Sequence, residues 1–181
     1  MDYKGITTLD LSHQELDELP DLNMYNDVVD LNCGCNNLVS FNFAHLPPNL
    51  KILSCIGNNL TTLDNLPASL KVLNCSWNNI TTLDNLPDYL EELDCSYNKL
   101  TTLDNLPLSL EVLYCNNNQI TSLDNLPYDI TKICCNFNQI TTLDNLPPKL
   151  TVLYCDDNPF TYKFKPSLSN IRKYNNVHIP P

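Results

Sequence analysis

The sequence predicts a solenoid, a stack of short turns joined through one parallel β-sheet. A block of twenty residues recurs without a gap, and its first leucine position falls at Leu53, Leu73, Leu93, Leu113, Ile133 (in place of Leu) and Leu153. Each block carries a cysteine two residues later and an asparagine five residues later. Apolar and polar residues alternate at Leu93-Asp94-Cys95, which is the period of a strand with one buried face. Because no unit of this length can bury its apolar side alone, neighbouring units are expected to stack.

Two earlier turns share this phase but are stretched, since Leu9 and Leu31 lie at intervals of twenty-two residues before Leu53. The sequence therefore predicts eight turns. The phase identifies Cys33 as the repeat cysteine and leaves Cys35 as an extra one. We predict an N-terminal capping turn and linker over residues 1–30, a repeat array over 31–158, and a C-terminal cap and tail over 159–181.

Within one unit, six positions recur as apolar and are expected to point inward: Leu93, Cys95, Leu100, Leu103, Leu106 and Leu110. The strands of successive turns should pair about 4.8 Å apart, so that these side chains form columns. The dipeptide Leu106-Pro107 favours extended or polyproline backbone on the return side of the turn. Helix should be nearly absent there.

The two ends of the chain differ from the array. Residues 1–20 read as a polar terminal turn, and extra residues at 21–27 and between Phe41 and Leu46 predict longer outer loops. After residue 158, Phe160, Tyr162 and Phe164 alternate with polar residues, as in a segment that covers the open end. Ser167 is expected to cap a short helix whose apolar face carries Leu168, Ile171 and Tyr174, and residues 178–181 form a loose tail.

The pattern Leu-x-x-Leu-x-Cys-x-x-Asn-x-Leu, at Leu90 to Leu100, resembles a leucine-rich repeat with Cys in place of one leucine. The variant Leu-Pro-x-x-Leu-x-x-Leu is similar to the short bacterial type found in secreted pathogen effectors. The cysteines, the Thr-Thr-Leu-Asp-Asn runs and the ending Asn158 to Tyr162 resemble repeat proteins of giant amoeba viruses such as mimivirus. The resemblance implies a solenoid of the α/β horseshoe class. This is a right-handed superhelix with a parallel β-sheet on its concave face and an extended or polyproline convex side with little helix.

The ladder asparagines are expected to satisfy the backbone groups that each bend would leave unpaired: Asn36, Asn58, Asn78, Asn98, Asn118, Asn138 and Asn158. The repeat cysteines are expected to be reduced and packed among leucines: Cys33, Cys55, Cys75, Cys95, Cys115, Cys135 and Cys155. A metal-binding ladder is the less favoured alternative, because no histidine shares their face. Cys35 and Cys134 fall at outward positions and are candidates for reactive thiols.

A column of aspartates recurs before an asparagine: Asp64, Asp84, Asp104, Asp124 and Asp144. The favoured interpretation is a turn in which each carboxylate accepts local backbone N–H bonds. A row of weak Ca²⁺ sites is the alternative.

Composition argues against several functions. The net charge of −11 would repel phosphate backbones and anionic membranes, so neither nucleic acid nor membrane is an expected partner. No apolar run approaches a bilayer span, and residues 1–5 lack a signal-peptide pattern, which predicts a cytoplasmic protein (host cytoplasm or virion if viral). His13, His45 and His178 occupy separate places in the array, and three glycines provide no phosphate-binding loop. We expect no enzyme, no cofactor and no bound metal.

The outward positions are where the copies differ, and they carry the candidate protein-binding residues: Val72, Trp77, Asp94, Tyr97, Val112, Tyr114, Asn117, Phe137 and Tyr154. Exposed aromatic groups of this kind are typical of interaction surfaces. The sequence thus predicts a monomeric protein-binding module that presents its concave face to a protein partner. The alternative is that these aromatic residues are present only because they favour the strand conformation and have no part in binding. A structural or virion component that self-associates is the second functional hypothesis, and an enzyme acting through an exposed thiol is the third.

Overall fold

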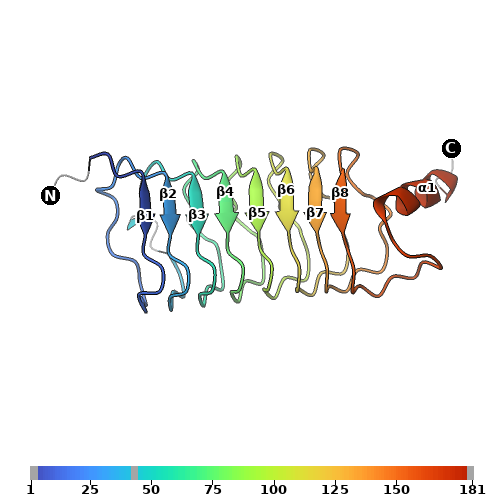
Figure 1. The fold of residues 1–181 in the computed structure, drawn as a ribbon, viewed down its shortest axis with the longest axis horizontal. Coiled ribbons are helices and arrows are strands. Elements are labelled where there is room, and N and C mark those ends of the chain that lie inside the picture. Colours follow the sequence, from blue (N-terminus) through green and yellow to red (C-terminus); the bar gives the residue numbers. More distant parts are fainter. Residues whose placement is uncertain (1–3, 42–44, 179–181) are drawn as a thin grey trace.

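The computed structural model describes residues 4–41 and 45–178, which form a row of stacked turns (Figure 1). The described residues contain eight strands of three residues each: β1 (Thr8–Asp10), β2 (Asp30–Asn32), β3 (Ile52–Ser54), β4 (Val72–Asn74), β5 (Glu92–Asp94), β6 (Val112–Tyr114), β7 (Lys132–Cys134) and β8 (Val152–Tyr154). They pair in parallel and in chain order within one sheet. The predicted parallel sheet, with one strand from each of the eight repeats, is confirmed.

The register of the sheet follows the sequence phase. Leu9 pairs with Leu31 and Leu31 with Leu53, although each interval is twenty-two residues. The two extra residues of each stretched turn are therefore taken up outside the strands. Cys33 is buried on the core side while Cys35 is exposed, so the phase identified the repeat cysteine correctly.

The core is a set of columns that run the length of the array. In the turn of β5, Leu93, Cys95, Leu100 and Leu110 are completely buried, and Leu103 is 4 % exposed. Leu106 is the exception among the six predicted inward positions, because it is only partly buried against the core. It lies between the two turns of the outer wall.

The outer wall has no helix within the described part of the array, as predicted, but it is not one continuous extended segment. Each regular unit makes two turns there, one at the Asp-Asn pair and one after the proline. In the second turn the N–H of Leu110 donates to the carbonyl of Pro107 at 3.1 Å. The Leu-Pro dipeptide joins the two turns, and Asn105 takes a φ of 64°, which asparagine tolerates better than most residues.

The C-terminal end is closed by α1 (Leu168–His178), which begins after Ser167. The hydroxyl of Ser167 accepts the N–H of Asn170 at 3.2 Å, so the predicted N-cap is confirmed. Ile171 is completely buried. The Arg172 guanidinium donates to the carbonyl of Leu150 at 2.6 Å, so this carbonyl of the last turn has a hydrogen-bond partner.

The C-terminal helix extends one residue into the predicted tail. His178 belongs to α1 and not to a loose tail, while residues 179–181 lie outside the described residues. Residues 42–44 of the second predicted outer loop also lie outside them. The predicted covering segment is present, since Phe160, Tyr162 and Phe164 pack against the core.

The asparagine ladder ties each turn to the one before it. The side-chain amide of Asn98 donates to the carbonyls of Cys75 at 3.0 Å and Cys95 at 3.1 Å, and its oxygen accepts the N–H of Ile80 at 2.9 Å. The same pattern recurs at Asn58, Asn78, Asn118, Asn138 and Asn158. Among the described residues, no buried side-chain nitrogen or oxygen lacks a partner. The predicted structural role of the ladder is confirmed.

Asn98→Ala should therefore destabilise the protein by about 1–3 kcal/mol, because the N–H of Ile80 loses its partner inside the core and the carbonyls of Cys75 and Cys95 each lose one of two donors. Chemical denaturation followed by circular dichroism measures the change. Asn59→Ala is the matched control, since Asn59 is exposed and one residue beyond its own ladder asparagine. Equal midpoints for the two variants would contradict the role assigned to the ladder.

Candidate functional site

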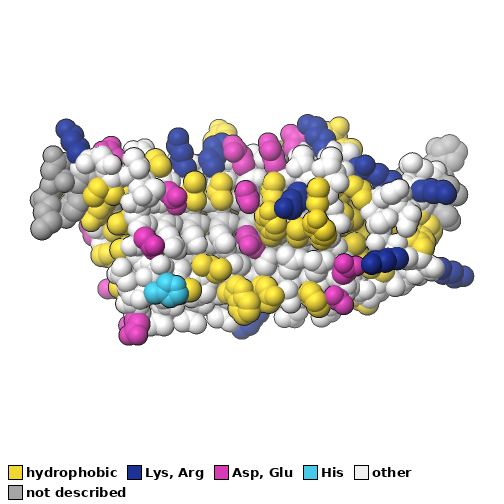
Figure 2. Space-filling model, viewed as in Figure 1, with side chains coloured by type: hydrophobic (Ala, Val, Ile, Leu, Met, Phe, Trp, Pro, Cys, Tyr) yellow, Lys and Arg dark blue, Asp and Glu magenta, His cyan; other side chains and the backbone are white. Residues whose placement is uncertain are grey.

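The first and third residues of every strand point away from the core and together form what we call the sheet face. Two rows run across β3–β8 in register: Ile52, Val72, Glu92, Val112, Lys132 and Val152 in one, and Ser54, Asn74, Asp94, Tyr114, Cys134 and Tyr154 in the other. The buried leucine between them fixes their direction, since alternate residues of a strand face opposite sides. Figure 2 shows hydrophobic side chains gathered on this face around a lysine over β6–β8.

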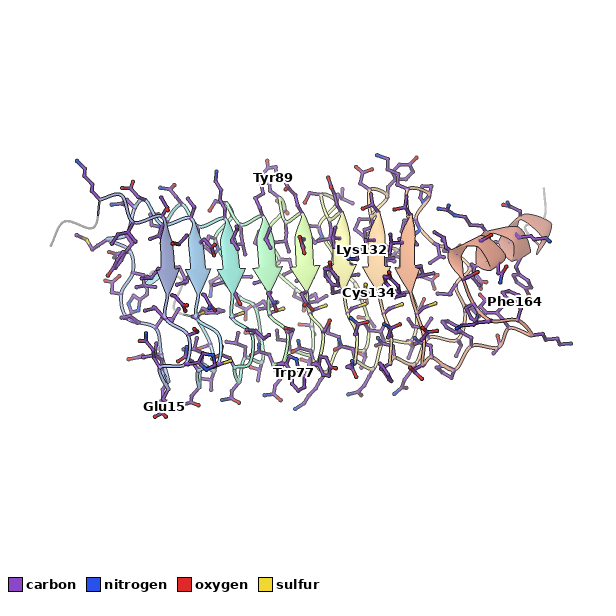
Figure 3. All side chains as sticks on the ribbon, viewed as in Figure 1. Glu15, Trp77, Tyr89, Lys132, Cys134 and Phe164 are labelled. Carbon is purple, nitrogen blue, oxygen red and sulfur yellow. The ribbon has the colours of Figure 1, made fainter. Side chains whose placement is uncertain are left out.

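The structure divides the predicted binding residues into two groups. Val72, Asp94, Val112, Tyr114 and Tyr154 lie on strands and belong to the sheet face. Trp77, Tyr97, Asn117 and Phe137 follow the strands and occupy the turn where the chain leaves the sheet. We call this turn position, which also holds Cys35, Gly57 and Asp157, the C-terminal rim; Figure 3 shows Trp77 beyond the strand ends.

The C-terminal rim has an unusual backbone for its side chains. Trp77, Tyr97 and Phe137 have φ values of 56°, 55° and 56°, in the left-handed region. This conformation costs non-glycine residues about 1–2 kcal/mol, and asparagine or glycine avoids most of that cost, as Asn117 and Gly57 do. The fold therefore does not favour aromatic residues at these positions.

The rim aromatics are also exposed. Trp77 is 56 % exposed and Phe137 54 %. Trp77 and Tyr97 stack with ring centroids 4.0 Å apart and planes at 10°. A preformed aromatic stack at the end of β4 and β5 provides a rigid surface with little side-chain entropy left to lose on binding.

On the sheet face, Tyr114, Lys132, Cys134 and Tyr154 form a cluster (Figure 3). The ammonium of Lys132 donates to the Tyr114 hydroxyl at 2.8 Å and stands 4.6 Å from the centre of its ring. The hydrogen bond with Tyr114 raises the pKa of Lys132. The cluster holds this lysine against an aromatic ring instead of against a carboxylate.

Cys134 corrects a sequence prediction. It points outward, as expected, but it is only 7 % exposed. The strands on either side place Tyr114 and Tyr154 in register with it, so a small side chain lies between two large ones. Burial raises the pKa of its thiol, although the charge of Lys132 opposes this shift. Cys134 is therefore not a reactive surface thiol, and Cys35 is the exposed cysteine of the described residues.

A second row of exposed apolar residues was not found from the sequence. Tyr89, Leu108 and Tyr128 are 64 %, 84 % and 65 % exposed, in the turns that lead into β5, β6 and β7. We call these three residues the N-terminal rim, and Figure 3 shows Tyr89 at that edge. Lys71 and Lys149 lie 5.6 Å and 5.4 Å from the tyrosine rings. The sequence does carry a signal for this row, because the two residues between the proline and the next leucine vary from unit to unit.

The repeat cysteines form a buried column of free thiols, as predicted. The Sγ of Cys95 donates to the carbonyl of Tyr114 at 3.4 Å, and the same bond recurs along the ladder. Burial raises the pKa of Cys33 to about 12 and that of Cys155 to about 11. Burial holds the pKa of Cys55, Cys75, Cys95 and Cys115 well above the ordinary value.

The aspartate column forms the predicted turns, but Asp64 and Asp84 accept hydrogen bonds from side-chain amides and not from local backbone N–H groups. The amide of the next turn's asparagine donates to the carboxylate, from Asn85 to Asp64 at 2.9 Å and from Asn105 to Asp84 at 2.9 Å. Hydrogen bonds from Ser122 and Asn145 lower the pKa of Asp124. The described residues contain no group of three His, Cys, Asp or Glu side chains placed to hold a metal ion.

Residues 89–128 match the family described as Leucine Rich repeats (2 copies). The leucine-rich effector protein YopM from Yersinia pestis is 32 % identical, with a TM-score of 0.79 over 86 % of this chain and 44 % of that one. A Shigella effector LRR domain is 28 % identical, with a TM-score of 0.73 over 94 % of this chain and 75 % of that one. Residues 89–128 are thus leucine-rich repeats, and the chain has the fold of leucine-rich repeat solenoids.

YopM from Yersinia enterocolitica WA-314 is also similar, with 30 % identity and a TM-score of 0.70 over 86 % of this chain. The chain spans 38 % of that structure and 44 % of the Yersinia pestis one. No curated protein matches the sequence. Across the described residues, no helix has the length and apolar character needed to cross a membrane.

Thiol labelling should separate Cys35 from the other eight cysteines of this protein. A small disulfide reagent under native conditions should label one thiol rapidly, since the remaining ones are buried, and nine after denaturation. Cys35→Ser should abolish the fast phase. A fast phase that survives in Cys35→Ser would show that Cys134 is accessible.

The cysteine column also predicts alkaline instability. Above pH 9.0 the buried thiols of the folded protein keep their protons, whereas the thiols of the unfolded chain release them. Unfolding therefore releases protons, and the free energy of unfolding falls as pH rises. The loss of stability should begin near pH 9.0 and continue towards about pH 12, which matches the pKa of Cys33 in the folded protein. Each such thiol contributes about 1.4 kcal/mol per pH unit to the slope.

Thermal melts across this pH range measure the slope. Cys115→Ala should make it shallower, because one buried thiol no longer titrates, and Cys35→Ser is the control that should leave it unchanged. Identical slopes for Cys115→Ala and the parent would exclude the buried thiols as its source.

Proposed function

We propose that this protein is a non-enzymatic protein-binding module. Its sheet face and C-terminal rim receive a protein partner. The observation that carries the proposal is the placement of Trp77, Tyr97 and Phe137 at exposed left-handed positions that the fold does not favour for aromatic residues. Tyr114 and Tyr154 add further aromatic area on the adjoining strands.

The comparisons support a role in host interaction. Two of the similar structures are effector proteins by their own descriptions, from Yersinia pestis and Shigella. Together with the resemblance to giant amoeba virus repeat proteins, this makes a host protein the proposed partner and the host cytoplasm the proposed location. The protein is proposed to act as a monomer, without nucleic acid or a membrane as partner.

A structural role through self-association is the second candidate, and one observation favours it. β1 stands at the end of the sheet, and Thr8 and Asp10 are exposed. An open strand edge can pair with another chain. A molar mass that rises with concentration in light scattering would support this role, while a constant monomer mass would exclude it.

The binding proposal is tested by capture from amoeba lysate with the parent and the variant Trp77→Ala, Tyr97→Ala, Tyr114→Ala. Loss of three anchors should weaken binding of the captured partner by at least about tenfold, because aromatic anchors contribute about 2 kcal/mol or more each. Affinity for the purified partner is then measured by titration.

The N-terminal rim provides a matched control. Tyr89→Ala, Leu108→Ala, Tyr128→Ala removes a similar apolar area from exposed positions on the other edge of the sheet, and it should leave binding unchanged. Both variants must melt like the parent. Equal affinity of all three proteins would remove the sheet face and C-terminal rim as the binding site.

A further inference from the structure

The sheet face carries an uneven charge. Its outward residues include four carboxylates, Asp10, Asp30, Glu92 and Asp94, and one lysine, Lys132. Glu92 and Asp94 lie two residues apart on β5, so both point outward from the same strand. The centre of the face is therefore acidic, and its β6–β8 end is aromatic.

Several carboxylates elsewhere on the molecule have partners. On the outer wall, Asp64 and Asp84 accept amide hydrogen bonds from the following turn. At the N-terminal side of the strands, Glu91 forms an ion pair with Lys71 at 2.6 Å. Repulsion between neighbouring turns is offset at these places within the protein itself.

The pair on β5 is different. Within residues 4–41 and 45–178, no lysine or arginine forms an ion pair with Glu92 or Asp94. Asp94 accepts a hydrogen bond from the N–H of Ser96 at 3.0 Å, which leaves most of its acceptor capacity open. Lys132, two strands away, is held by Tyr114 instead. Two like charges on one strand thus face solvent without an opposing cation.

We infer that the partner presents a basic polypeptide segment to this face, with an arginine or lysine on Glu92 and Asp94. The inference rests on the proposed function and specifies the chemistry of the partner. Charge complementarity of this kind selects partners and speeds association. An arginine has a further advantage, because the Trp77–Tyr97 stack begins where β4 and β5 end, and guanidinium groups stack on aromatic rings.

The geometry also sets a spacing in the partner. Tyr154 on β8 lies three strands from Asp94 on β5, which is about 14 Å at the usual separation of paired strands. An extended segment that crosses the strands covers this distance in about four residues. The basic residue of the partner should therefore stand about four positions from an apolar residue that packs against Tyr114 and Tyr154.

Selection from a displayed library of random twelve-residue peptides against the whole protein tests this inference. Enriched peptides should carry net positive charge with the basic–apolar spacing above. Labelled copies, measured by fluorescence anisotropy, should bind Glu92→Gln, Asp94→Asn about tenfold more weakly than the parent and should weaken with added salt. Asn74 already accepts the corresponding bond from Ser76 at 3.0 Å, so the Asp94→Asn change preserves the local turn.

The control variant Asp88→Asn, Asp104→Asn also removes two negative charges, but from exposed positions that lie off the sheet face. It should bind the peptides like the parent. The variant Tyr114→Ala, Tyr154→Ala separates the two proposals. Neutral or acidic peptides that lose affinity only in the tyrosine variant would overturn the basic partner and leave the binding face standing. Peptides unaffected by either variant, or no enrichment at all, would contradict both.

Discussion

The fold depends on one constraint, the need to satisfy backbone groups where each turn leaves the sheet. With strands of three residues, the bend lies against the core and not in water. From Asn58 onward, each ladder asparagine meets this need by donating to the carbonyls of two successive repeat cysteines and accepting one N–H from the preceding turn, as at Asn98. The amide side chain has both donors and an acceptor, so no other side chain of its length serves both purposes.

The cysteine column follows from the same crowding. The carbonyls that the asparagines bind belong to the cysteines, so the side chain at that position must be small and tolerant of burial. The thiol adds a weak bond to the carbonyl of the next turn at 3.4 Å. Leucines fill the wider parts of the turn and are completely buried on either side. The high thiol pKa values are a consequence of this packing and require no chemical role for sulfur.

Since the core fixes the inward positions so closely, only the outward ones are free to differ between turns. The sheet face and both rims carry residues that differ from turn to turn, and each turn presents them about 4.8 Å from the next. An array of this kind offers an extended surface that runs across its successive turns. In the proposed binding module, specificity depends on which aromatic and charged groups occupy successive turns.

The sequence by itself determined the period, the eight strands, most of the inward columns and the C-terminal helix with Ser167 at its N-cap, because each of these follows from residue types and their spacing along the chain. It also identified the outward aromatics of the strands and of the C-terminal rim, but not Tyr89 and Tyr128. Only the tertiary structure decided what neighbouring turns do to one another. Cys134 is buried because Tyr114 and Tyr154 stand beside it, and Asp64 is bonded to an amide twenty-one residues away. The rim position of Trp77 likewise depends on a left-handed backbone that no local preference of tryptophan would select.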